Sequence, residues 1–120
     1  MTLAEATARL ERMTASTVDP TLTDDEITDL LTAAARVDTD GLAPTDDDWT
    51  GTWDLNFAAA EGWRWKAGKV AERFAANLDG ANLARQQIFE HCLAMATNYS
   101  RRVVGTFTIA GDDTAAVLAN

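Results

Sequence analysis

Apolar residues recur at helical spacing along most of this 120-residue chain, in four segments that are separated by helix-breaking residues. Side chains three and four positions apart share one face of a helix, so each segment can bury one stripe against its neighbours. Alternation typical of a strand occurs near the C-terminus, over residues 103–109. We therefore predict an all-α protein, a small helical bundle of about four helices with a long antiparallel hairpin and an extended C-terminal arm.

Capping boxes mark the starts of the first two helices. In each, a threonine hydroxyl and a glutamate carboxylate three residues later can satisfy free backbone N–H groups. The two pairs are Thr2 with Glu5 and Thr23 with Glu26. We expect the first helix to fray around Ser16 and the second to span about residues 24–36. The Asp19-Pro20 pair separates them, because proline disfavours helical geometry at the preceding residue.

Two longer helices are expected to follow, the third over about residues 53–76 and the fourth from about 82 to 102. About five residues join them, so they must pack antiparallel. Residues 1–102 then form one helical domain, and residues 103–120 form the arm. The expected apolar face of the third helix comprises Trp53, Phe57, Ala60, Ala67, Ala71, Phe74 and Leu78, and that of the fourth comprises Ile88, Cys92, Met95, Ala96, Tyr99 and Val103.

Residues 38–52 are expected to form an acidic loop, because they combine five aspartates with Gly41, Pro44 and Gly51. We expect this loop to be the most mobile internal segment, with Trp49 and Trp53 packed back on the core at its end. The aspartates lack the spacing of an EF-hand calcium loop, so a solvated loop is favoured over a metal site.

The net charge of −9 is unevenly distributed. Residues 1–60 hold thirteen acidic and three basic side chains, whereas residues 61–110 hold four acidic and seven basic ones. Two interpretations remain open: the halves neutralise one another inside one fold, or the acidic part of one copy meets the basic part of the next. The acidity disfavours wrapping of duplex DNA. No apolar run is long enough for a membrane span and no signal peptide is recognisable, so we expect a soluble intracellular protein.

Few residues of the chain suit catalysis. His91 and Cys92 are adjacent, so on a helix they point about 100° apart and cannot act on each other directly. No phosphate-binding loop, nucleophile elbow or paired-cysteine motif occurs. We therefore expect no enzyme, no cofactor and no metal.

Interaction surfaces are the remaining candidates for function. The third helix carries a basic stripe beside an aromatic residue, on the side expected to be exposed, and the arm carries two apolar residues suited to strand addition. A merely solvated face is the alternative for the stripe. The candidate interface residues are Trp65, Lys66, Lys69, Arg73, Phe107 and Ile109.

The order and spacing of several short motifs over residues 22–102 resemble the head–tail connector adaptors of long-tailed bacteriophages. The motifs are Leu-Thr-Asp-Asp-Glu at 22–26, an alanine-rich helix from Phe57, Trp-x-x-Lys-Ala at 63–67, Ala71, Phe74, Asp-Gly-Ala at 79–81, Arg85-Gln86, and Met95-Ala96 with Tyr99. The frequent Ala, Thr and Asp resemble proteins of phages with GC-rich actinobacterial hosts. The acidic loop is longer than this family leads us to expect.

The resemblance implies a structural virion protein. Such adaptors lie in the host cytoplasm before assembly and then form a ring, commonly of twelve copies, beneath the portal protein at the virion neck. The ring extends the DNA channel and docks the next neck protein, while genomic DNA passes through without sequence-specific binding and no membrane is involved. Two alternatives come from other classes: a small helical protein-binding regulatory module, and a nucleic-acid-binding helical domain that uses the basic third and fourth helices.

Overall fold

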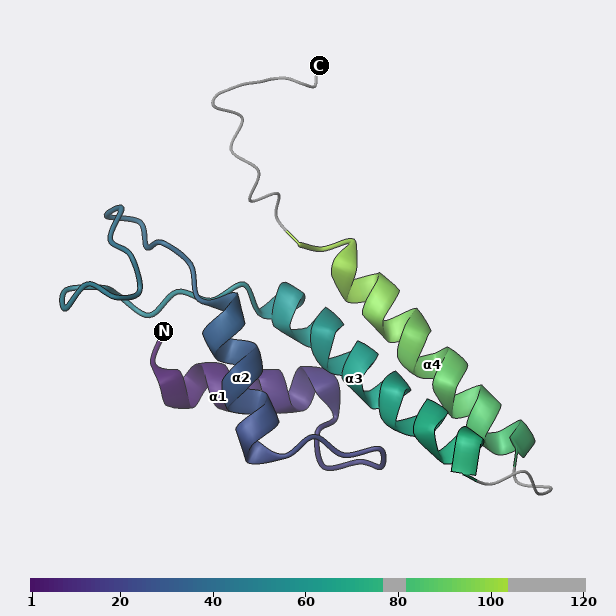
Figure 1. The fold of residues 1–120 in the computed structure, drawn as a ribbon. Helices are drawn as coiled ribbons and strands as arrows, with labels where there is room; N and C mark the ends of the chain where they lie inside the picture. Colours follow the sequence, from purple (N-terminus) through teal and green to yellow (C-terminus); the bar gives the residue numbers. More distant parts are fainter. Residues whose placement is uncertain (77–81, 104–120) are drawn as a thin grey trace, which may run out of the picture.

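A computed structural model describes the backbone of residues 1–76 and 82–103, and the side chains of residues 1–73 and 84–103. The elements are α1 (Leu3–Thr14), α2 (Asp24–Ala34), α3 (Leu55–Ala76) and α4 (Asn82–Ser100), as Figure 1 shows. No strand occurs in this part of the chain, and the all-α prediction is confirmed. Apart from Val103, the predicted arm lies outside the described residues, as do Phe107 and Ile109.

Both predicted capping boxes form. The Thr2 hydroxyl accepts from the Glu5 N–H at 3.1 Å, and the Glu5 carboxylate accepts from the Thr2 N–H at 2.9 Å. The Thr23 and Glu26 pair repeats this arrangement at 3.1 and 2.8 Å. Each box satisfies N–H groups that have no partner within the helix, which fixes where α1 and α2 begin. The helix α2 ends at Ala34, two residues before the predicted end.

The helix α3 packs against each of the other three helices. Its first turns bury Ala58 and Ala59 in a cluster with residues of α1 and α2. Trp63 and Ala67 lie in a second cluster with residues of α4, which runs antiparallel to α3 (Figure 1). The predicted hairpin is therefore present, but the prediction of one apolar face on α3 is wrong, because this central helix buries two.

A glycine allows α3 to approach α1 and α2 closely. A Cβ atom at Gly62 would lie 2.9 Å from Cγ2 of Thr14 and 3.3 Å from the Cδ1 atoms of Leu22 and Leu30. A larger residue would therefore push the helices apart or force these side chains to move.

The helix α4 packs against α3 alone among the helices in the described part of the chain. Cys92 and Ala96 are buried there, as predicted. The placement of Ile88 on the buried face is wrong, since 38% of this residue is exposed. Phe89, one position later, packs against the buried cluster instead. Within the described residues, no helix combines the length and apolar character needed to cross a membrane.

Candidate protein interface

One basic residue of α3 is buried in the bundle. Lys66 is only 1% exposed, so its predicted place on an exposed stripe is wrong. Its Nζ donates to the carbonyl oxygens of Thr14 at 2.6 Å and Ala15 at 2.7 Å, and lies 4.3 Å from the Trp63 ring centroid. The ammonium thus binds carbonyls at the C-terminal end of α1, where the helix dipole favours a cation. Burial lowers the pKa of Lys66 below its usual value.

The next two basic residues of α3 hold the segment between α1 and α2. Lys69 Nζ donates to the Thr21 carbonyl at 2.7 Å and to the Glu26 carboxylate at 2.6 Å. Arg73 makes two hydrogen bonds of 2.9 Å with the Asp19 carboxylate. These bonds to Lys69 and Arg73 lower the pKa values of the two carboxyl groups. On this face, the acidic and basic halves of the chain pair inside one fold.

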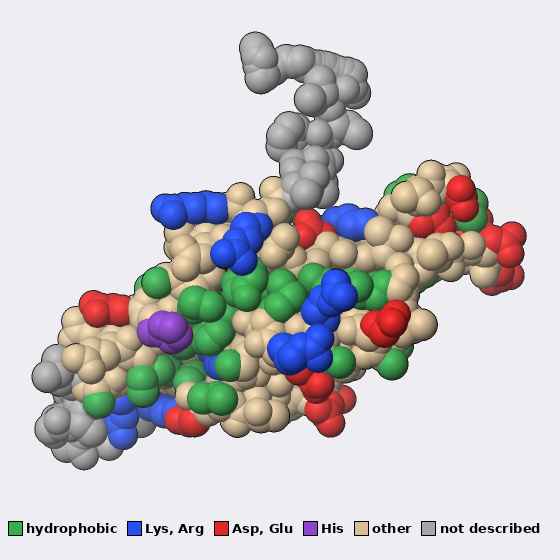
Figure 2. Space-filling view, turned by 180° about the vertical axis from the view of Figure 1, so that it is seen from behind, with side chains coloured by type: hydrophobic (Ala, Val, Ile, Leu, Met, Phe, Trp, Pro, Cys, Tyr) green, Lys and Arg blue, Asp and Glu red, His purple; other side chains and the backbone are tan. Residues whose placement is uncertain are grey.

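Trp63 lies between Lys66 and His91. The rings of His91 and Trp63 meet edge-on, with centroids 5.5 Å apart. His91 remains exposed, whereas Trp63 is buried. Figure 2 shows this histidine, in purple, among hydrophobic side chains. Cys92 is buried beside this group, and burial raises the pKa of its thiol. The burial of Cys92 agrees with its predicted place on the apolar face of α4.

Trp65, the aromatic residue beside the predicted basic stripe, lies on the surface of α3. It is 36% exposed, and the next glycine on α3, Gly68, has open space where a Cβ atom would lie. Large exposed aromatics are common in protein interfaces, so Trp65 remains a candidate contact residue.

The acidic loop is anchored at its base. The Asp38 carboxylate is buried and accepts backbone N–H bonds from Thr50 at 2.8 Å and from Asp40 and Leu42 at 2.9 Å. The bonds from Thr50 and Leu42 contribute most to lowering the pKa of Asp38. Asp38 therefore organises the base of the loop.

Two tryptophans close the loop, as the sequence predicts. Trp49 Nε1 donates to the Arg36 carbonyl at 2.8 Å, and the rings of Trp49 and Trp53 meet edge-on with centroids 5.3 Å apart. Trp53 also pairs with Ala35 in an isolated antiparallel bridge. The remaining aspartates of the loop are exposed, and Figure 2 shows acidic side chains gathered where this loop projects from the bundle.

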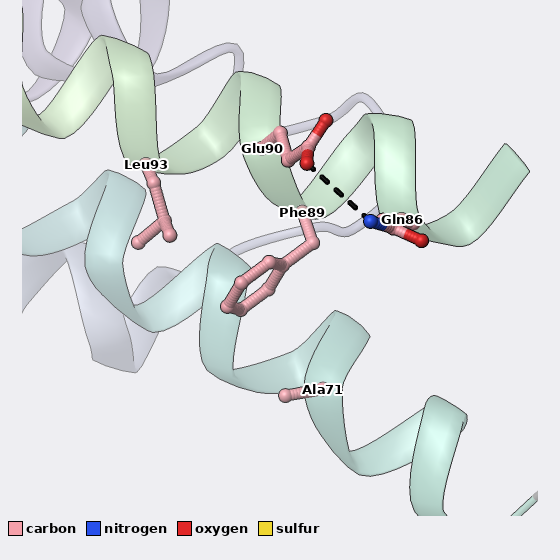
Figure 3. A pocket seen from close by; sticks show the side chains of 5 residues that line it. All are labelled: Ala71, Gln86, Phe89, Glu90 and Leu93. Atoms are coloured by element: carbon pink, nitrogen blue, oxygen red, sulfur yellow. Dashed lines mark hydrogen bonds between the residues drawn. The ribbon is translucent and has the colours of Figure 1, made fainter. Parts of the chain in front are cut away.

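An apolar groove lies between α3 and α4 (Figure 3). Ala71, Phe89 and Leu93 supply its apolar lining, and Gln86 and Glu90 supply its polar edge. Its volume is about 460 Å³. Gln86 Nε2 lies 3.5 Å from the Glu90 carboxylate, a long hydrogen bond that leaves the carboxylate exposed.

The groove was not predicted from the sequence. Phe89 and Leu93 are four residues apart, the spacing that puts two apolar side chains on one helix face, and this pair is the signal that could have identified it. A comparable signal existed for Lys66, because small and apolar residues stand four positions before and after it, at Gly62 and Val70.

The C-terminal end of α4 carries exposed basic groups. Arg101 and Arg102 follow the last turn, and the Arg102 guanidinium lies 5.2 Å from the Tyr99 ring centroid. Neither arginine forms an ion pair with a carboxylate in the described part of the chain. Asn56 Nδ2 donates to the Arg102 carbonyl at 3.3 Å, which ties this end of α4 to the start of α3.

Comparisons with known protein families, curated proteins and solved structures find no match to this chain. Among the described residues, no group of three or more His, Cys, Asp or Glu side chains is arranged to hold a metal ion. The groove, the acidic loop and the arginines after α4 are candidate interaction surfaces among the described residues.

Proposed function

We propose that this protein is a structural subunit of a bacteriophage virion, a head–tail adaptor that forms a ring beneath the portal, extends the DNA channel and docks the next neck protein. The observation that carries the proposal is the order of the helices with the long α3–α4 hairpin. Three of the resemblance motifs support it: Leu-Thr-Asp-Asp-Glu lies at the start of α2, Trp63 and Ala67 lie in the buried part of α3, and Met95-Ala96 with Tyr99 lies on the face of α4 that packs on α3. Ala71 is exposed, and the Phe74 side chain and residues 79–81 lie outside the described part of the chain.

The charge of the protein supports a passage for DNA better than a site that retains it. Phosphate binding requires a basic surface, and the chain carries a net charge of −9. Two of the basic residues on α3 pair with acidic residues of the first half of the chain. An acidic ring would repel the duplex along its length and let it slide.

Electron microscopy of the virion neck, on a phage that encodes this chain, tests the proposal. We expect density for a ring of four-helix subunits directly below the portal. A neck in which another protein fills this position, or a virion that lacks the chain, would refute the adaptor function.

Two solution measurements separate the proposal from the alternatives. A gel-shift assay with duplex DNA should show little binding at low salt, whereas a nucleic-acid-binding domain would bind in a salt-sensitive way. Copurification with the portal should give a ring of copies bound to it, whereas a regulatory module would form a one-to-one soluble complex with its target.

A further inference from the structure

The groove between α3 and α4 combines an apolar lining with an acidic edge. Leu93 lies beside Phe89 in the groove and is 41% exposed, so a partner could bury both side chains further. The Glu90 carboxylate stands at the edge and forms no ion pair with a described residue. A segment that fits this groove would therefore present an aliphatic side chain next to a cation.

The end of α4 has that chemistry. Arg101 and Arg102 are exposed, and the half-buried Val103 follows them directly. We propose that residues 101–103 of one copy dock in the groove of a second copy, with an arginine beside Glu90 and Val103 toward Phe89 and Leu93. This contact deepens the proposed function and rests on it, since it supplies the subunit interface that a ring requires.

The contact must join two copies. Glu90 and Ser100 lie on the same helix and are about 15 Å apart along its axis at the usual rise per residue. An arginine just beyond Ser100 cannot span this distance while its backbone is tied to Asn56. The two patches occupy different parts of one molecule, so copies can join head-to-tail, and repeated copies close into a ring when the rotation between them permits.

Charge reversal at each patch tests the pairing. In the groove variant Gln86→Lys/Glu90→Lys, both the groove edge and the end of α4 are basic. In the end variant Arg101→Glu/Arg102→Glu, both of these patches are acidic. Each variant should repel its own copies. An equal mixture restores opposite charges at every contact, because each groove then meets an end of the other sign, and the mean net charge stays close to that of the wild type.

Sedimentation velocity is the measurement, at about 0.1 M salt, where charges beyond about 10 Å are screened. Protein concentrations run from about 1 µM to 1 mM, so that dissociation constants in this range can be measured. We expect the wild type to associate weakly with itself. The association constant should fall about tenfold or more in each variant alone and recover in the mixture. Circular dichroism on each variant verifies that the helices are retained.

Matched controls carry the same change of charge elsewhere. Thr45→Lys/Asp47→Lys on the acidic loop matches the groove variant, and Arg9→Glu/Arg12→Glu on α1 matches the end variant. Both controls should associate like the wild type. Equal loss in the controls, no recovery in the mixture, or a wild type that stays monomeric throughout would overturn the proposed contact.

The outcome is separable from that of the proposed function. Copies that associate through this contact, in a protein that the virion neck does not contain, would retain the contact and refute the adaptor. A neck ring whose subunits meet through other surfaces would retain the adaptor and refute the contact.

Discussion

Replacing Lys66 by methionine should destabilise the protein strongly, although methionine fits the apolar part of the site. The ammonium donates to the Thr14 and Ala15 carbonyls, and no other described residue donates to the Thr14 oxygen. The Ala15 oxygen keeps a second donor, the N–H of Val18 at 3.0 Å. The substitution therefore leaves one buried acceptor without a partner and weakens the bonding of another.

The magnitude follows from these contacts. An unsatisfied buried acceptor costs about 1–3 kcal/mol, and the lost bond to Ala15 costs about 1 kcal/mol more. Loss of the cation above Trp63 adds about 1 kcal/mol. Methionine recovers part of this, because it buries apolar surface and removes the cost of burying a charge. We expect a net loss of about 3 kcal/mol in the free energy of unfolding, which lowers Tm by about 10 °C for a chain of this size.

Urea unfolding followed by circular dichroism measures the change, and Lys69→Met is the matched control. Lys69 forms similar bonds, but 29% of its side chain is exposed, so its loss should cost about 1 kcal/mol or less. Wild-type stability in Lys66→Met, or equal losses in the two variants, would refute the conclusion that the buried ammonium holds the end of α1.

Two further predictions concern α3 and the acidic loop. Gly62→Ala should lower the free energy of unfolding by about 1–3 kcal/mol relative to Gly68→Ala, because only the first substitution places a methyl group against Thr14. Both substitutions gain helix propensity, so Gly68→Ala is the matched control. Thermal unfolding measures the difference, and equal Tm values for the two variants would contradict it. The lowered pKa of Asp38 contributes stability above the usual pKa of about 4 that is lost as the pH falls, since the unfolded chain then binds more protons. Asp38→Asn should therefore reduce stability at pH 7 and flatten its decline toward pH 3 in urea unfolding, and an unchanged decline would exclude this role for Asp38.

Local rules account for the parts of the fold that the sequence predicts well. A capping box needs only residues within four positions of one another, so Thr23 and Glu26 locate the start of α2 without knowledge of the rest of the chain. The hairpin follows from two long helical segments and a short connection. The all-α class and the closure of the loop by Trp49 depend on patterns of this kind.

The burial of Lys66 could not be obtained from a single apolar stripe. Helical periodicity identifies one face at a time, whereas α3 is covered on two sides, so a residue opposite the first stripe can face a second neighbour. The side chain of lysine is largely aliphatic, and its ammonium needs only acceptors at the far end. Those acceptors are carbonyls at the end of α1, about fifty residues away in the sequence, and local patterns carry no information about them.

The internal pairing of α3 bears on how copies of this protein can recognise one another. If the basic half of the chain were exposed along its whole length, it would meet the acidic half of another copy in many registers. Long-range electrostatic attraction alone does not select one of these registers. With Lys69 and Arg73 paired to Glu26 and Asp19, the basic groups after α4 stand apart from that stripe, next to Val103. A cation beside an aliphatic side chain fits an apolar groove with an acidic edge in one position and loses that fit when shifted by a turn. In the proposed contact, the ion pairs of Lys69 and Arg73 would thus restrict assembly to a single geometry, which is the property that a closed ring needs.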